Sequence, residues 1–290
     1  MDSGMVAQVR SFNRTVTQRV GALDEAYLSR GRPLGQARLL WEISESPCEV
    51  RALRARLDLD SGYLSRLLAA LQKDGLVAVE TDPDDARVRT ARLTPAGRAE
   101  RAELDRLSDE LAQTMIRPLN GEQRGRLVAA MAEVERLLVA SMVDVSVTDP
   151  RHPDAQLCMS SYYDDLATRF ETGFDPAATR PAEDDAITLL VARLHEEPVG
   201  CGALKAYPTE RCADVKRMWV SPTVRGLGVG RRLLAELEKH ARGLGVRTLR
   251  LETNKALVEA IGLYRAAGFV EVEAFNDEPY AHHWFTKTLD

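Results

Sequence analysis

The feature that most constrains this chain is a glycine-rich turn at residues 225–230, with the sequence Arg-Gly-Leu-Gly-Val-Gly. An apolar segment, 213–220, precedes it, and a run with leucines at helical spacing continues after it to about residue 244. A glycine turn between a strand and a helix leaves backbone N–H groups at the positive end of the helix dipole, where phosphate groups bind. Taken alone, the motif fits glycines that serve only tight packing equally well. Its spacing is neither that of a Rossmann fingerprint nor that of a P-loop.

The second half of the chain predicts an α/β domain around this turn. Short apolar runs with strand patterning alternate with segments of helical periodicity. The expected elements are a strand at 143–147, a helix at 155–170, strands at 187–194, 199–207 and 213–220, a helix ending near 244, a strand at 248–253, a helix at 256–268, and two final strands of which the last is 282–289.

Three segments of this half occur in an order and spacing that resemble the GNAT superfamily of N-acetyltransferases. They are ADVKRMWV before the glycine turn, LETN ending at Asn254, and AIGLYRAAGF ending at Phe269. The resemblance covers residues 143–290 and implies a mixed, mostly antiparallel sheet with flanking helices. It also implies an N-acetyltransferase that takes the acetyl group from acetyl-CoA, with no metal.

The resemblance also implies where acetyl-CoA binds. Strand backbone would pair with the pantetheine arm, and the amides of the glycine turn would surround the pyrophosphate because glycines let the backbone approach closely. Asn254 would contact the pantetheine, and Tyr264 would lie beside the thioester sulfur. The implied cofactor-binding residues are Met218, Trp219, Val220, Arg225, Gly226, Leu227, Gly228, Val229, Gly230, Arg231, Asn254 and Tyr264.

Acetylation of an amine needs a proton acceptor and a proton donor. An alkyl amine with a pKa of about 10.4 is protonated at neutral pH, so it must lose a proton before it attacks a thioester. Asp214 is the expected base, and Tyr264 is the expected acid for the departing thiolate. The alternatives are that Asp214 is an exposed strand residue paired with Lys216, and that Tyr264 is only a buried aromatic residue.

Two segments rich in aromatic residues are expected to flank the acceptor pocket. In similar enzymes the regions corresponding to 170–185 and 275–285 lie beside the acceptor. Aromatic walls of mixed polarity suit a small amine as well as a lysine side chain, and one of the two adjacent histidines should point outward. The expected pocket residues are Phe174, Tyr280, His282, His283 and Trp284.

The first half of the chain predicts a mainly helical domain. Helical patterns at about 5–28, 34–46, 50–60 and 61–73 are followed by a strand at 76–80, a polar loop and a second strand, which is the order of a winged helix-turn-helix. This order, with DPDDAR followed by LTPAG, resembles the MarR family of transcriptional regulators. The resemblance implies binding to double-stranded DNA, with 61–73 as the recognition helix.

The leucines of segment 61–73 identify the face that would enter a major groove, because four of them define the opposite, buried face. In the MarR-like arrangement Asp85 would orient Arg87 toward the adjacent minor groove. The expected DNA-binding residues are Ser61, Tyr63, Ser65, Arg66, Arg87 and Arg89.

Long helical patterns at 95–115 and 122–142 are expected to pair two copies of the chain, and a homodimer would suit a palindromic operator. The alternative is an intrachain bundle. Charge argues against strong DNA binding, since residues 1–146 hold 21 Lys and Arg against 22 Asp and Glu. A platform that only dimerises therefore stays open as an alternative. Lys73 is the only lysine of residues 1–146, and hence the one lysine there that the second half could acetylate.

We expect two domains, 1–142 and 143–290, in a cytoplasmic protein. No apolar run approaches the roughly 20 residues of a membrane-spanning helix, and no secretory signal pattern follows Met1. The four cysteines and five histidines lack metal-ligand spacing. Three functions remain open: a regulator fused to an active acetyltransferase, a regulator that senses acyl-CoA without turnover, and an acetyltransferase whose winged helix only dimerises.

Overall fold

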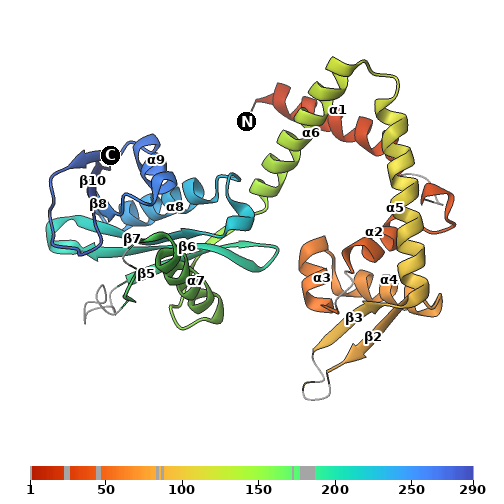
Figure 1. Ribbon diagram of the computed structural model, residues 1–290, viewed down its shortest axis with the longest axis horizontal. Helices are drawn as coiled ribbons and strands as arrows, with labels where there is room; N and C mark the ends of the chain where they lie inside the picture. The colour runs from red at the N-terminus through yellow and green to blue at the C-terminus, as the bar shows by residue number, and fades with distance from the viewer. Residues whose placement is uncertain are drawn as a thin grey trace. The chain divides into compact units, whose positions relative to one another are not determined.

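The computed structural model describes residues 2–22, 27–43, 47–82, 85, 88–171, 173–176 and 187–289. The chain divides into two compact units, Met1–Ala132 and Glu133–Asp290 (Figure 1). The division falls inside helix α6 (Gly121–Ser141), ahead of the boundary expected at 142. Each unit has a hydrophobic core of its own.

Unit 1 has the predicted order of a winged helix-turn-helix. Its small antiparallel sheet has the strand order β1-β3-β2. The elements are α1 (Ser3–Arg19), a 3₁₀ turn (Tyr27–Ser29), α2 (Leu34–Glu42), β1 (Cys48–Glu49), α3 (Val50–Leu57), α4 (Ser61–Lys73), β2 (Val77–Thr81), β3 (Arg89–Leu93), α5 (Pro95–Ile116) and the first part of α6.

The opening helix is shorter than predicted, because α1 ends at Arg19 rather than near residue 28. Gly21 adopts a positive φ of 67°, which ends a right-handed helix. The start of α5 is fixed by Thr94, whose hydroxyl accepts the Gly97 amide at 3.0 Å. A Cβ at Gly97 would lie 1.9 Å from the Leu76 carbonyl oxygen, so only glycine lets α5 approach β2 this closely.

Unit 2 confirms the predicted mixed sheet. Its seven described strands have the order β4-β5-β6-β7-β8-β10-β9, and within this described sheet the β7–β8 pair is the parallel one. The elements are β4 (Asp144–Thr148), α7 (Pro153–Arg169), β5 (Ile187–Leu194), β6 (Glu197–Tyr207), β7 (Cys212–Val220), α8 (Val229–Gly243), β8 (Thr248–Thr253), α9 (Val258–Ala266), β9 (Val270–Val272) and β10 (His283–Thr288).

Helices cover both faces of this sheet (Figure 1). Because side chains alternate along a strand, β5 sends Leu189 and Val191 into a cluster with α7, and Leu190 and Ala192 into the main core with α8. Burial on both faces explains why β5 and β6 are nearly continuous apolar runs. The helices thereby hold the central strands in a fixed register.

Candidate functional site

The central sheet of unit 2 opens between β7 and β8. These parallel strands pair over only three positions, and the last pair is Asp214 with Arg250. Beyond it β7 continues to Val220 and β8 to Thr253, with no pairing between them. The later part of β7 therefore presents backbone groups to a cleft instead of to a neighbouring strand.

A β-bulge lies in β7 at the same place. Cys201 pairs with Trp219 and Ala203 with Lys216, so β7 has one residue more than β6 between these pairs. Arg217 occupies this stretch with a positive φ of 54°. The Cys201 thiol donates to the Arg217 carbonyl at 3.4 Å and holds the bulge against β6. A bulge takes a residue out of the ladder and turns nearby backbone groups toward the cleft.

The glycine turn places free amides at the end of this strand. Gly226 and Gly228 have φ values of 84° and 79°, which side-chain-bearing residues rarely adopt. Helix α8 begins at Val229 without a side-chain cap, so the amides of its first turn point out of the helix. Gly230 serves packing instead, because a Cβ there would lie 3.3 Å from Leu263 Cδ2. The glycines of the turn thus fit both interpretations of the motif, exposed amides for a phosphate group and tight packing.

Two cavities meet in the cleft. The larger cavity, of about 580 Å³, borders the glycine turn, and the smaller cavity, of about 240 Å³, borders the middle of β7 and the end of β8. The larger one contains every residue predicted to bind the cofactor except Asn254, which lines the smaller one. Six residues line both cavities: Tyr162, Leu166, Met218, Leu257, Ala260 and Tyr264.

Two tyrosines therefore lie at the junction. Tyr264 of α9 packs against Phe269 and Phe285, at centroid distances of 5.9 and 6.1 Å. Burial raises the pKa of Tyr264, and the nearby Glu252 raises it further. Burial likewise raises the pKa of Tyr162 of α7. Within the described residues neither hydroxyl has a hydrogen-bond partner, so both are available to a ligand. Nothing in the sequence around Tyr162 distinguished it.

Asp214 is buried and held by two partners. Arg250 Nε donates to its carboxylate at 2.9 Å, and the Tyr207 hydroxyl donates at 3.2 Å. Burial and the Asp214 charge raise the pKa of Tyr207 to about 12. The alternative of an exposed Asp214 paired with Lys216 is wrong, because Lys216 forms its ion pair with Glu252. Asp214 lines the smaller cavity, with part of its hydrogen-bonding capacity already used.

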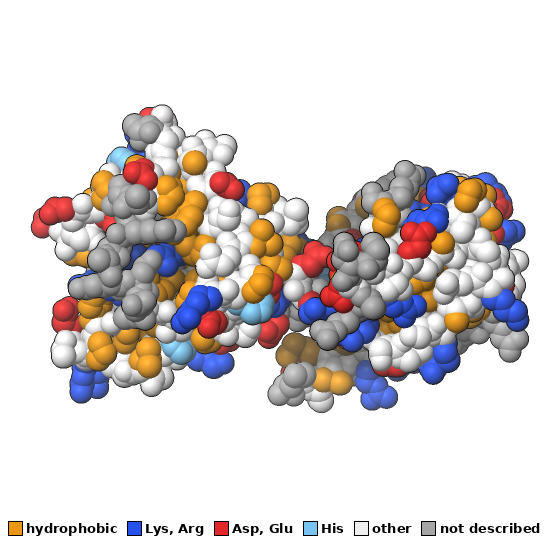
Figure 2. All heavy atoms as spheres, turned by 90° about the horizontal axis from the view of Figure 1, so that it is seen from below, with side chains coloured by type: hydrophobic (Ala, Val, Ile, Leu, Met, Phe, Trp, Pro, Cys, Tyr) orange, Lys and Arg blue, Asp and Glu red, His pale blue; other side chains and the backbone are white. Residues whose placement is uncertain are grey.

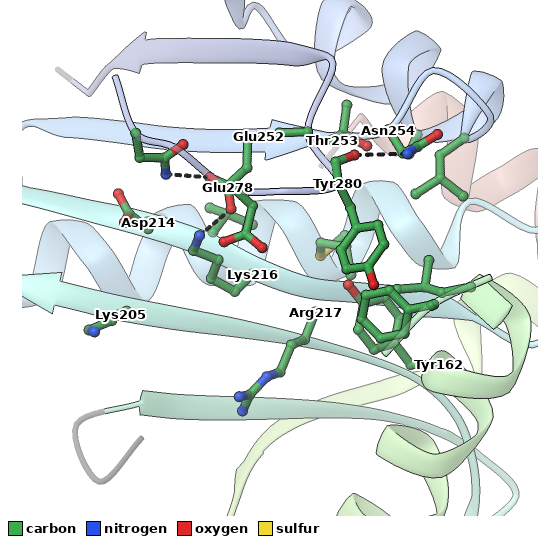
Figure 3. A pocket seen from close by; sticks show the side chains of 18 of the residues that line it. Tyr162, Lys205, Asp214, Lys216, Arg217, Glu252, Thr253, Asn254, Glu278 and Tyr280 are labelled. Atoms are coloured by element: carbon green, nitrogen blue, oxygen red, sulfur yellow. Dashed lines mark hydrogen bonds and ion pairs between the residues drawn. The ribbon is translucent and has the colours of Figure 1, made fainter. Parts of the chain in front are cut away.

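Two further carboxylates face the smaller cavity (Figure 3). Glu252 of β8 is bound by Lys216 and lies 3.5 Å from the amide of Asn276. Glu278, from the segment before β10, has its pKa raised by burial and by the charge of Glu252. The smaller cavity thus brings together residues of β7, of β8 and of a segment over 20 positions later in the chain. No local sequence pattern predicts this grouping.

Asn254 joins the end of β8 to the segment over the cleft. Its side-chain amide donates to the Tyr280 carbonyl at 2.8 Å, and its oxygen accepts the Ala256 amide at 2.9 Å (Figure 3). Both ends of the side chain are thus engaged within the chain. Its contact with pantetheine stays a prediction.

The structure brings some of the predicted pocket residues together but not others. Phe174 and Tyr280 line the smaller cavity, with ring centroids 5.0 Å apart. His282, His283 and Trp284 line neither cavity. His283 contacts Glu271 at 2.7 Å and the Trp284 indole donates to Asn276. Both residues belong to β10, which lies between β8 and β9.

Unit 1 presents the predicted DNA-reading face. On α4 the four leucines at 64, 67, 68 and 71 are buried, and the other face is exposed. Arg66 lies 5.7 Å from the centre of the Tyr63 ring, so the two side chains are held together. The exposed predicted residues are Ser61, Tyr63, Ser65, Arg66 and Arg89.

Arg87 lies outside the described residues, and with it the predicted contact between Arg87 and Asp85. Around it, the Asp82 amide donates to the Val88 carbonyl at 2.8 Å, which closes the base of the wing. Figure 2 shows the Lys and Arg side chains of unit 1 spread among acidic ones, in agreement with the balanced charge of this half.

Within the described ranges no cluster of His, Cys, Asp and Glu side chains could hold a metal ion. The helices described here also include none with the length and apolar character needed to cross a bilayer.

Comparison with known proteins identifies both units. The model of the acetyltransferase (GNAT) family matches residues 154–269, and the model of the MarR family matches residues 30–88. The chain thus joins a MarR-type regulator domain to a GNAT acetyltransferase domain, as the sequence motifs predicted.

Two curated relatives and one solved structure each match about half of the chain or less. An IAA acetyltransferase of Azospirillum brasilense is 44% identical over 94 residues, which are 32% of this chain and 60% of that protein. A Thauera aromatica protein, named as a candidate transcriptional regulatory protein for the hcr operon, is 25% identical over 134 residues, which are 46% of this chain and 75% of that protein. A solved structure of a candidate acyl-CoA N-acyltransferase from Klebsiella pneumoniae is 27% identical, covers 51% of this chain and 99% of its own, and has a TM-score of 0.43.

Proposed function

We propose that this protein is a bifunctional transcriptional regulator and N-acetyltransferase. Unit 2 transfers the acetyl group of acetyl-CoA to a primary amine by direct attack on the thioester, and unit 1 binds DNA. The observation that carries the enzymatic part is the pair of cavities that meet at Tyr264. One cavity borders the glycine turn, where we propose that the pyrophosphate binds, and the other borders carboxylates, so a donor and an acceptor can meet between them.

Acetyl-CoA binds along the larger cavity in this proposal. The pyrophosphate lies against the turn from Arg225 to Arg231. The Arg225 and Leu227 amides already donate to the carbonyls of Pro222 and Val224, so the amides of the first turn of α8 are the ones that bind it. The pantetheine arm pairs with the backbone of Met218 to Val220, because this edge of β7 has no strand beside it. The thioester then reaches the junction beside Tyr264.

The reaction requires the amine to lose a proton, form the C–N bond and expel the thiolate. A carboxylate of the smaller cavity takes the proton, directly or through water. Asp214, predicted as the base, has only its remaining lone pairs for this task. Backbone amides near the Arg217 bulge stabilise the oxyanion, and Tyr264 donates a proton to the thiolate. Its raised pKa keeps the Tyr264 hydroxyl protonated at neutral pH.

DNA binding uses the exposed face of α4 and the wing. Arg66 and Arg89 contact phosphates or base edges, and two copies of the chain bind a palindromic operator as a homodimer. Exposed apolar side chains support pairing between copies. On α1 they are Met5, Val6, Val9, Phe12 and Val16, and on the unit 1 part of α6 they are Val128 and Met131. We propose that this regulator works in the cytoplasm.

Thiol release tests the enzymatic proposal. Acetyl-CoA is incubated with the full chain, with and without a panel of primary amines, and free coenzyme A is measured. We expect release only when an amine is present. Tight binding of acetyl-CoA without release by any amine would instead identify a sensor. For unit 1, we expect a salt-dependent mobility shift of upstream DNA, and its absence in a protein that is dimeric would leave dimerisation as the role of this unit.

A further inference from the structure

The smaller cavity has an aromatic wall. Four rings from three segments pack side by side. Tyr163 lies in α7 and Phe170 directly follows this helix, while Phe174 and Tyr280 come from two later segments. Tyr163 stacks on Phe174 at 5.9 Å, and Phe170 lies 5.8 Å from Phe174 and 5.7 Å from Tyr280. The Tyr280 hydroxyl accepts the Asp175 amide at 3.0 Å, which fixes the wall in place. A flat apolar group can lie against it.

Three carboxylates face the same cavity, and two of them are neutralised inside the protein. Asp214 is paired with Arg250 and Glu252 with Lys216. Glu278 has no ion pair or side-chain hydrogen bond among the described residues, although its surroundings are partly desolvated. The charge of Lys216 offsets this desolvation only in part, because the pKa of Glu278 stays raised, and a cationic group entering the cavity would relieve it further.

We propose that the acceptor is a small aromatic amine, whose ring lies on the wall of Tyr163, Phe170, Phe174 and Tyr280 and whose ammonium group is received by Glu278. This inference rests on the proposed function and specifies its acceptor. The volume of about 240 Å³ agrees, because it is near the lower limit of ligand pockets and holds a body of one or two rings. Glu278 is a positioning residue here, and the proton acceptor is a separate question.

The test compares three probes on the full chain saturated with coenzyme A: 2-phenylethylamine, ethylamine and a short peptide with one lysine. Binding is measured by calorimetry, and acetylation by thiol release from acetyl-CoA. We expect 2-phenylethylamine to bind at least about tenfold more tightly than ethylamine, the ratio that burial of one ring supplies. We also expect it to be acetylated with a higher kcat/KM than the peptide.

Variants separate the ring from the charge. Phe174→Ala should weaken the binding of 2-phenylethylamine and leave the binding of ethylamine unchanged. Phe174→Leu replaces it if the alanine variant fails to fold. Glu278→Gln should raise the KM of both amines about tenfold while the KM of acetyl-CoA stays the same. Glu273→Gln, an exposed acidic residue of the same segment, is the matched control and should change nothing.

The outcomes distinguish this inference from the proposed function. Preference for the lysine peptide, or an unchanged amine affinity in Glu278→Gln, overturns the inference while thiol release still supports an acetyltransferase. Ring-dependent and Glu278-dependent amine binding without any thiol release supports the inference and overturns the proposed activity.

Discussion

Arg250 Nε donates a 2.9 Å hydrogen bond to the buried carboxylate of Asp214, and these two residues are also the last pair at which β7 and β8 lie in register. The ion pair therefore stands at the point where the sheet opens. We infer that it fixes this branch point, because the loss of either partner would leave a charge without compensation beside the cavity.

The first prediction concerns this pair. Asp214→Asn should lower the free energy of unfolding by about 1–3 kcal/mol, since Arg250 loses its main partner. The shape of the pH–rate profile should persist at reduced activity. Urea unfolding and a pH series measure the two effects. A variant of unchanged stability that loses the acidic limb of the profile would instead make Asp214 the base.

Tyr264 is the subject of the second prediction. Tyr264→Phe should reduce kcat by about 100-fold, the usual contribution of a positioned proton donor, while the KM of acetyl-CoA changes little. Because burial raises the pKa of Tyr264, wild-type activity should show no loss from its ionisation between pH 7 and 10. Tyr162→Phe is the comparison, since its hydroxyl lines the same junction. A larger loss of kcat in Tyr162→Phe would transfer the role of acid to Tyr162.

The glycine turn gives the third prediction. Gly228→Ala forces a side chain into the φ of 79° and should cost about 1–2 kcal/mol in stability and weaken coenzyme A binding. Gly262→Ala is the matched control, because this glycine of α9 has open space around a Cβ and an ordinary φ. It should be neutral or stabilising by up to about 1 kcal/mol. Calorimetry with coenzyme A and thermal unfolding measure both, and equal affinities in the two variants would exclude the turn as the phosphate site.

The sequence predicts the fold of unit 2 better than it predicts the site. The order of strands and helices in unit 2 follows from alternation and periodicity, and the glycine turn marks where the cofactor cleft begins. The role of Gly230 in packing against Leu263 depends on how α8 and α9 come together, which local pattern does not encode. In the same way, the partner of Asp214 is 36 positions away and reaches it only through the parallel pairing of β7 with β8.

The pocket was harder to foresee than the cleft. Phe174 and Tyr280 are expected from the aromatic residues that cluster around them in the sequence. Glu278 lies in a segment without regular periodicity, and the position of Tyr162 in its helix gives no sign of a role in the site. The two histidines are expected in the pocket from their place in segment 275–285, yet neither lines a cavity, because this end of the segment joins β10, which pairs with β8 and β9. Side-chain direction in such segments is set by tertiary packing.

The fourth prediction is a pH effect on stability at Glu278. Its pKa is raised in the folded state above the ordinary value of 4.5, so the folded protein favours the neutral carboxyl. The stability that this gives is present below pH 4.5 and is lost as the pH rises through the raised pKa. Glu278→Gln should therefore have a higher melting temperature than wild type at pH 7 and the same one near pH 4. Glu273→Gln should match wild type at both, and a pH-independent difference would contradict the assignment.

The last prediction concerns DNA. If Arg66 and Arg89 grip phosphates, Arg66→Ala and Arg89→Ala should each weaken binding to all sequences and reduce the slope of log affinity against log salt by about 1. Arg117→Ala is the control, because this exposed arginine at the end of α5 lies outside the predicted reading elements. Fluorescence anisotropy with an upstream duplex at several salt concentrations measures the slopes. An unchanged slope with altered sequence preference in Arg66→Ala would mean that Arg66 reads a base edge, because neutral base atoms release no counterions while they still discriminate among sequences.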